Sequence, residues 1–183
     1  MAAVGPALSA RVRAWIARDP DPQTRAELEA MLAAGDGAGL AERFAGRLEF
    51  GTAGLRGVMA GGPARMNRLV VRESAAGIAR YLSDHVEGAA ARGVVVGHDA
   101  RHRSGAFAAD CAQVIAGHGI GVRLMEEPAP TPVAVFAIRE TGAAAGLVVT
   151  ASHNPPADNG LKLYGGDGAQ IGPPVDGLSL IHI

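Results

Sequence analysis

Apolar residues in the first 47 positions recur with helical spacing. Val12, Trp15 and Ile16 would share one face of a first helix, which the proline-containing segment 19–22 ends. Thr24 and Glu27 have the spacing of a capping box at the start of a second helix. The apolar face of that helix is formed by Leu28, Met31 and Leu32, and a shorter helix follows at residues 40–45. The pattern predicts a helical extension over residues 1–47 that serves packing.

From residue 50 the pattern changes to short β-branched runs that alternate with helical stripes. The predicted helices cover residues 69–86, 107–115 and 131–140, and the predicted strands cover residues 94–96, 122–125, 147–149 and 161–164. The strand at 94–96 is the kind of run expected of a buried parallel strand. Alternation of strands and helices indicates an α/β layered domain.

The densest polar cluster, TASHNPP at residues 150–156, directly follows a predicted strand. Ligand sites of open α/β sheets lie at the carboxyl ends of strands, and the prolines favour a stiff, extended loop. Ser152 is therefore presented as a nucleophile or phosphate carrier, although an ordinary polar turn is the alternative. A hydrolase triad is disfavoured, because His153 would point away from Ser152 and the flanks are not G-x-S-x-G.

Lys162 is the only lysine among 17 basic residues. An ammonium group can be tuned to donate and accept protons, whereas a guanidinium stays protonated. Asn159 and Gly160 form a tight-turn signal that would fold the following strand back beside the serine loop and bring Lys162 close to Ser152. The alternative is a surface lysine in a chain whose arginine content reflects a GC-rich genome.

Two glycine-containing segments are candidates for phosphate contact. Residues 51–57 combine backbone freedom with Arg56, and residues 97–101 end a strand with a carboxylate and Arg101. Neither segment is a P-loop or a dinucleotide fingerprint, and each is also compatible with a simple turn.

Composition excludes several classes of function. With 183 residues and 48% hydrophobic content, the chain has the length of one domain and enough apolar side chains for a core. A net charge of −1 and 4% aromatic residues exclude electrostatic binding to nucleic acid or an anionic membrane. The single Cys111 excludes an internal disulfide and a multi-cysteine metal site. Because no signal peptide or membrane-spanning run is evident, a cytoplasmic location is expected.

Several motifs together resemble one family. TASHNP at 150–155 resembles the phosphoserine loop of the α-D-phosphohexomutase superfamily. FGTAGLRG at 50–57, RMN at 65–67, DNGLKLY at 158–164 and GAQI at 168–171 look like its phosphoglucomutase/phosphopentomutase (phosphoglucomutase/phosphomannomutase) branch. Trp15 and residues 19–24 are similar to the N-terminal extension of that branch. The resemblance covers residues 10–175 and implies a three-layer domain I, residues 48–175, with a mixed, mostly parallel sheet.

The resemblance implies an intramolecular phosphotransferase that interconverts sugar 1- and 6-phosphates, or pentose 1- and 5-phosphates. Phosphorylated Ser152 would pass its phosphoryl group to the substrate and receive the other phosphate back from a bisphosphate intermediate. Mg²⁺ and a sugar 1,6-bisphosphate activator are implied, with the phosphate on Ser152 as one metal ligand. The implied catalytic residues are Ser152, Lys162, Arg56 and His153. The implied substrate- or phosphate-binding residues are Thr52, Asn154, Arg101 and Asn159, with Arg101 implied as a contact of either the phosphate or the loop.

The chain departs from this family in its extent. Family members have four domains, and the aspartate-rich metal loop, the sugar-discriminating loop and the C-terminal phosphate loop lie downstream of domain I. We therefore expect a domain I fragment that is inactive alone, partnered by the missing domains, with residues 176–183 as an artefactual tail. A non-catalytic sugar-phosphate-binding domain is the alternative. The choice between hexose and pentose substrates stays open.

Overall fold

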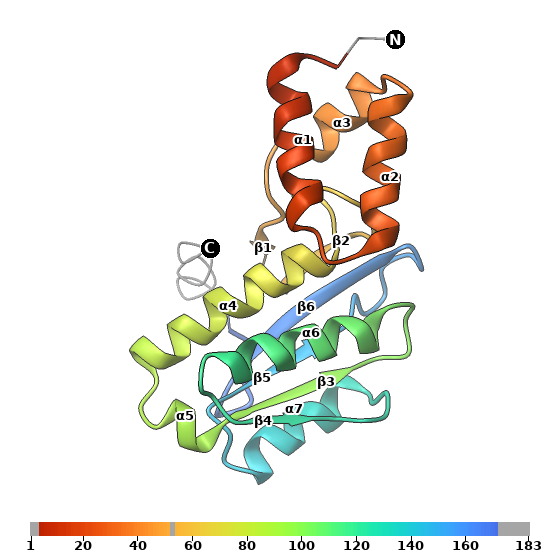
Figure 1. The fold of residues 1–183 in the computed structure, drawn as a ribbon. Coiled ribbons are helices and arrows are strands. Elements are labelled where there is room, and N and C mark those ends of the chain that lie inside the picture. The colour runs from red at the N-terminus through yellow and green to blue at the C-terminus, as the bar shows by residue number, and fades with distance from the viewer. Residues whose placement is uncertain (1–3, 52–53, 172–183) are drawn as a thin grey trace.

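The computed structural model describes residues 4–51 and 54–171, and Figure 1 shows three N-terminal helices standing on an α/β domain. These helices are α1 (Pro6–Arg18), α2 (Pro22–Ala33) and α3 (Gly37–Arg43). Their buried faces include Val12, Trp15 and Leu28, which confirms the helical stripes expected from the sequence.

The start of α2 differs from the prediction. Asp21, not Thr24, caps the helix by accepting a hydrogen bond from the backbone N–H of Gln23, at 2.9 Å. Pro22 occupies the first helical turn, where a missing N–H costs nothing. Thr24 instead donates its hydroxyl to Asp19 Oδ2 at 2.7 Å, and Glu27 accepts from the backbone N–H of Gly61. The predicted capping box is therefore wrong.

The α/β domain contains one six-stranded sheet in the described residues, with the order β1-β2-β6-β5-β3-β4. The strands are β1 (Phe50–Gly51), β2 (Gly54–Val58), β3 (Val94–His98), β4 (Val122–Leu124), β5 (Ala145–Val149) and β6 (Asp158–Gly165). Every residue of β3 and β5 is buried, as expected of central strands.

The sheet is mixed, as expected, but it is less parallel than the resemblance implied. Of the five pairings between these strands, β3 with β4 and β3 with β5 are parallel, and the other three are antiparallel. The connection from β5 to β6 spans only residues 150–157, which is too short for the crossover that a parallel pair requires. Strands β1 and β2 occupy the segment that was interpreted only as a phosphate loop.

Helices cover both faces of the sheet and produce three layers (Figure 1). Helices α4 (Arg68–His85) and α6 (Ser104–Gly117) pack on one face through the larger core, which includes Ile78, Phe107 and Leu161. Helix α7 (Thr131–Glu140) packs on the other face through a smaller core that includes Ile138 and Val148. A short helix, α5 (Ala89–Arg92), precedes β3. No helix among the described residues has the length and apolar character needed to cross a membrane.

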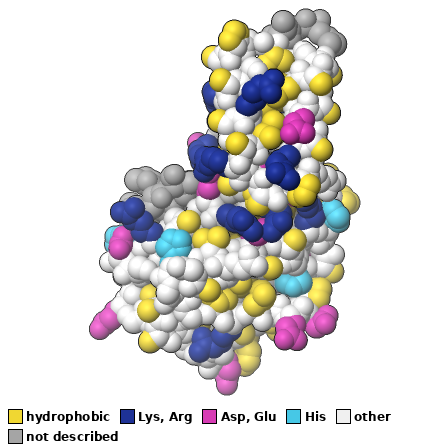
Figure 2. Space-filling view, in the orientation of Figure 1, with side chains coloured by type: hydrophobic (Ala, Val, Ile, Leu, Met, Phe, Trp, Pro, Cys, Tyr) yellow, Lys and Arg dark blue, Asp and Glu magenta, His cyan; other side chains and the backbone are white. Residues whose placement is uncertain are grey.

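Ion pairs join α4, in the layer that covers the sheet, to the N-terminal segment. Figure 2 shows basic side chains gathered where the two parts meet. Arg18 and Arg47 both pair with Glu73 of α4. On the neighbouring surface, Arg68 and Arg72 converge on Asp110 of α6, whose side chain is 1% exposed.

The predicted tail, residues 176–183, lies outside the described residues.

Candidate active site

The serine loop, residues 150–157, connects β5 to β6 at the carboxyl end of β5, where the sequence placed it. The backbone N–H of Thr150 donates to Gly160 O at 3.0 Å and closes the base of the loop. Ser152 is exposed and has a φ angle of 55°, a left-handed conformation that is uncommon for a residue other than glycine. Its N–H donates to Thr150 Oγ1 at 2.9 Å, which leaves the hydroxyl pointing outward from a fixed turn.

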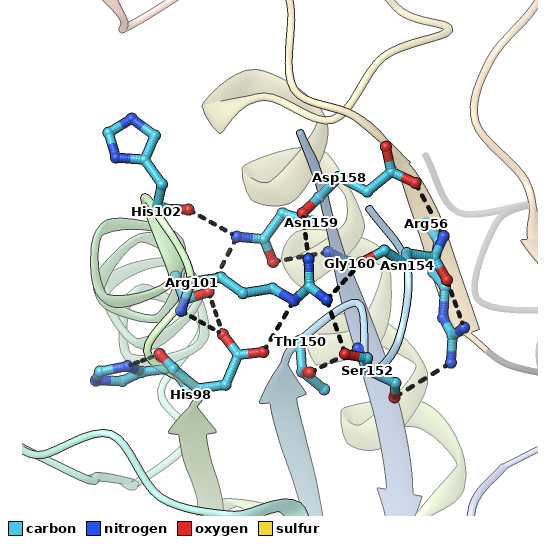
Figure 3. Close-up of polar contacts among 12 residues, drawn as sticks. Arg56, His98, Arg101, His102, Thr150, Ser152, Asn154, Asp158, Asn159 and Gly160 are labelled. Atoms are coloured by element: carbon cyan, nitrogen blue, oxygen red, sulfur yellow. Dashed lines mark hydrogen bonds and ion pairs between the residues drawn. The ribbon is translucent and has the colours of Figure 1, made fainter. Parts of the chain in front are cut away.

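Arg101 holds this loop from the turn that follows the neighbouring strand β3 (Figure 3). Its guanidinium donates to the carbonyl oxygens of Ser152 and Asn154, both at 2.7 Å, and to those of Pro155 and Asp158, at 2.9 and 3.3 Å. One planar cation thus satisfies four carbonyls that a tight loop leaves unpaired. Arg101 contacts the loop rather than an open phosphate position.

The turn that carries Arg101 is itself fixed by hydrogen bonds to Asp99, Ser104 and Asn159. Asp99 Oδ1 accepts from the Arg101 N–H at 3.0 Å and from the Ser104 hydroxyl at 2.6 Å. Asn159 is fully buried and donates to His102 O and Ser104 Oγ, both at 3.0 Å. Asn159 therefore supports the turn from inside the protein, which differs from the substrate contact that the resemblance implied.

The tight turn predicted at Asn159 and Gly160 is wrong. Asn159 and Gly160 lie within β6 and form no tight turn; the serine loop itself reverses the chain. A Cβ atom on Gly160 would lie 2.6 Å from Leu55 O and 2.8 Å from Thr150 O. Glycine is needed here because three backbone segments approach one another closely.

Arg56 of β2 reaches the serine loop from the other side. Its guanidinium donates to Asn154 Oδ1 at 3.0 Å and to the Ser152 hydroxyl oxygen at 3.4 Å, while Asn154 donates to Asp158 Oδ2 (Figure 3). The buried Nε of Arg56 has no hydrogen-bond partner among the described residues. The structure thus brings together the predicted residues Ser152, Arg56 and Asn154, with a cation directed at the serine oxygen.

Lys162 lies on the same side of the sheet as Arg56. Its register partner on β5 is Val148, and Arg56 pairs with Gly160, two residues before Lys162. Burial, and then repulsion from Arg56, lower the pKa of Lys162 below its ordinary value. Within the described part of the chain, Lys162 makes no hydrogen bond or ion pair, so no carboxylate there offsets the charge of its ammonium.

The structure shows no hydrogen bond between the Ser152 hydroxyl and the remaining predicted residues that it describes. His153 is exposed beside Ser152 and has no hydrogen bond to a residue that the structure describes. Thr52 lies outside the described residues. Sequence reasoning assigned no role to Ser104 or Thr150, because a buried hydroxyl that braces a turn leaves no spacing signal.

A shallow depression of about 490 Å³ opens next to the loop, lined by Asp99, Ala100, Arg101, His102, Ser152 and Pro156.

The described residues do not fit a complete magnesium site. No cluster of three or more His, Cys, Asp or Glu side chains occurs within residues 4–51 and 54–171. The carboxylates near Ser152 already accept hydrogen bonds: Asp99 from Ser104 and Arg101, and Asp158 from Asn154. An oxygen-rich cation site needs several free oxygen ligands, and this surface supplies mainly cations and donors.

Comparisons with known proteins identify the family to which this fold belongs. The family described as phosphoglucomutase/phosphomannomutase, alpha/beta/alpha domain I, matches residues 47–178. A probable phosphoribomutase of Schizosaccharomyces pombe is 43% identical over 171 residues, which cover 93% of this chain and 29% of that protein. A mouse phosphopentomutase is 38% identical over 168 residues, covering 88% of this chain and 27% of that protein.

A solved structure of a putative phosphomannomutase from Thermus thermophilus superposes with a TM-score of 0.68 at 34% identity, covering 75% of this chain and 30% of that one. The chain therefore spans less than a third of the length of these relatives. The match over most of the α/β domain, together with the fold, shows that the chain belongs to the phosphoglucomutase/phosphomannomutase family and comprises its domain I.

Proposed function

We propose that this chain is the phosphoserine domain of a phosphosugar mutase, which interconverts sugar 1- and 6-phosphates or pentose 1- and 5-phosphates. One observation carries the proposal: the exposed Ser152 hydroxyl stands on a loop fixed by four Arg101 hydrogen bonds, with the Arg56 guanidinium 3.4 Å from its oxygen. Phosphoryl transfer depends mainly on positioning and charge stabilisation, and this arrangement supplies both.

In the proposed reaction, phosphorylated Ser152 gives its phosphoryl group to a free hydroxyl of the sugar monophosphate. The bond between phosphorus and Ser152 Oγ breaks, and a bond between phosphorus and the sugar oxygen forms. The sugar hydroxyl loses its proton to a base, and the departing Ser152 Oγ takes up a proton, so that the serine hydroxyl is restored and can be rephosphorylated. The resulting bisphosphate reorients and returns its other phosphate to Ser152.

Lys162 is the proposed acid/base group for this proton. Because its pKa is lowered, Lys162 loses its proton more readily than an ordinary lysine, and in the proposed step its amine accepts the hydroxyl proton and returns it in the reverse step. Arg56 stabilises the charge on the transferring phosphoryl group, because its guanidinium already faces the serine oxygen. His153 and Asn154 are the neighbouring candidates for holding the loop and the substrate.

We also propose that Mg²⁺ takes part, held by the phosphate on Ser152 together with ligands from the rest of the protein. When bound, such an ion neutralises phosphate charge and orients the transferred group. Among the described residues of this chain, the only metal ligand that we propose is the phosphate on Ser152. The proposed partners are small sugar phosphates and the other domains of the same protein, and this substrate class supports a cytoplasmic location.

Phosphate mapping on the full-length protein tests the proposal. After incubation with glucose 1,6-bisphosphate or ribose 1,5-bisphosphate, mass spectrometry should find phosphate on Ser152. Ser83 is an exposed serine of α4 and serves as the internal control, which should stay unmodified. Protein that is folded but unlabelled at Ser152 would refute the phosphoserine role and favour a sugar-phosphate-binding domain.

The role of Lys162 has its own test. Lys162→Arg retains the positive charge but replaces an ammonium that can lose its proton with a guanidinium that stays protonated. We expect turnover to fall while phosphate on Ser152 is still detected. Unchanged turnover would refute the acid/base assignment without affecting the phosphoserine.

A further inference from the structure

The N-terminal helices contact the turn that holds the serine loop. Asp21 caps α2 through one carboxylate oxygen, and its other oxygen, Oδ2, pairs with the guanidinium of Arg103. The side chains of Asp21 and Arg103 are only 5% and 15% exposed, so solvent screens this ion pair weakly. Removing one member would leave the other as an uncompensated, largely buried charge.

Arg103 has a backbone conformation that needs such an anchor. Its φ angle is 68°, in the left-handed region, and it directly precedes α6. An arginine is strained there, and such strain persists only where the surroundings hold it. The guanidinium also lies over the ring of Phe107, 5.9 Å from its centre, so both its charge and its planar face are fixed.

The strained residue lies in the turn that carries Arg101. The N–H of Ser104 donates to Arg101 O at 3.1 Å, and Ser104 also binds Asp99, which accepts from the Arg101 N–H. A change of backbone angle at Arg103 therefore moves the origin of the Arg101 side chain. That side chain makes the four hydrogen bonds that set the path of the serine loop.

We infer that Asp21 is a positioning residue for the phosphoserine site, acting through Arg103 and Arg101. Asp21 lies outside residues 47–178, which match the domain I family, but within the 171-residue match to the phosphoribomutase relative. The N-terminal helices thus contribute to phosphoryl transfer without contacting the substrate. This inference rests on the proposed function for its kinetic part only.

The test compares Asp21→Asn with Asp36→Asn in the full-length protein. Asparagine at either position retains an oxygen for the helix cap and loses the charge. Asp36 is the matched control, because it caps α3 by accepting from the Gly39 N–H at 2.9 Å. Amide hydrogen exchange of peptides spanning 99–104 and 150–158 reports the geometry, and single-turnover transfer from phosphorylated Ser152 reports the chemistry.

We expect Asp21→Asn to raise exchange in both peptides and to slow transfer about tenfold, with KM changed less than about twofold. Asp36→Asn should leave both readouts at the level of the parent protein. Arg103→Gln should reproduce the Asp21→Asn effect, and the double variant should be no slower than either single variant, because both remove one interaction. Arg103→Lys, which retains a cation, should restore most of the rate.

Three results would overturn the inference: equal effects of Asp21→Asn and Asp36→Asn, additive effects in the double variant, or unchanged exchange in the serine loop. If Asp21→Asn does not fold, the comparison of Arg103→Gln with Arg103→Lys decides alone. Absence of phosphate on Ser152 in the parent protein would instead refute the proposed function, and the exchange measurements would still test the link between Asp21 and the loop.

Discussion

Replacing Arg101 with methionine removes the guanidinium that holds the serine loop and keeps most of the aliphatic stem. The variant loses hydrogen bonds to four carbonyl oxygens and a contact at 3.4 Å between its Nε and Asp99 Oδ2. We expect the α/β domain to stay folded, because its core lies under α4 and α6 and does not include Arg101. The change should act on the serine loop.

The size of this effect follows from the exposure of the groups. A hydrogen bond from a charged donor contributes about 1.5–3 kcal/mol, so four independent bonds would give roughly 6–12 kcal/mol. The loop carbonyls lie at the surface and regain water when the cation is removed, which returns much of this energy. We expect the free energy of opening the loop to fall by about 2–4 kcal/mol, which raises the open population roughly 30- to 900-fold.

Native-state hydrogen exchange measures this population. The reporters are the backbone amides of Ser152, Asn154 and Asp158, each of which donates a hydrogen bond inside the loop. Arg80→Met is the control, because Arg80 is 64% exposed and its pair with Asp84 is a surface contact at 3.7 Å. If these three amides exchange at the parental rate in folded Arg101→Met protein, Arg101 does not hold the loop.

Three further predictions concern single side chains. Competitive amine labelling, resolved by site, should show that the pKa of Lys162 lies below its ordinary value of 10.5, and that Arg56→Gln raises it only partly, because burial is the larger cause. Since folding lowers this pKa, the contribution of Lys162 to the free energy of unfolding should rise with pH from the folded pKa up to the unfolded one; a fall would contradict the assignment. Ser152→Gly and Ser152→Ala should both lose phosphorylation, but denaturant unfolding should find the glycine variant more stable by about 1 kcal/mol, because only alanine retains a Cβ at a φ of 55°; equal stability would argue against strain at this position. Burial raises the pKa of the Cys111 thiol, so mass spectrometry should find it unalkylated until the protein unfolds, and rapid alkylation of native protein would contradict the core placement.

Local periodicity was enough to predict most of the helices and the central strands. Residues 94–96 and 147–149 are β-branched or apolar runs that lie in β3 and β5, and the stripe over 69–86 lies in α4. The buried face of such an element is set by the spacing of apolar residues, which can be recognised within a short stretch of sequence. The same reasoning missed β1 and β2, because β2 depends on pairing with β6, about a hundred residues away, and the edge strand β1 depends in turn on β2.

The sequence named residues that the structure gathers around the serine loop, but it did not predict their contacts. The sequence motifs identified Ser152, Arg56 and Arg101, but the hydrogen bonds of Arg101 to the serine loop join residues that are more than fifty positions apart. Asn159 and Gly160 show the opposite error, since a dipeptide typical of tight turns lies in a strand that is paired on both sides. Turn propensity is a weak preference, and two ladders of backbone hydrogen bonds override it.

The contacts around Ser152 also explain what kind of ligand this surface favours. Arg101 occupies the carbonyl oxygens of the loop, so their lone pairs do not face an incoming anion. The group that faces the Ser152 oxygen is the guanidinium of Arg56, and Lys162, on the same side of the sheet, adds a second positive charge with no ion-pair partner among the described residues. A phosphate there meets positive charge and N–H donors, and its oxygens become the anionic ligands that a cation on this surface would require. In the proposed function, the loop would therefore recruit the phosphate first, and a metal ion would follow the charge that the phosphate brings.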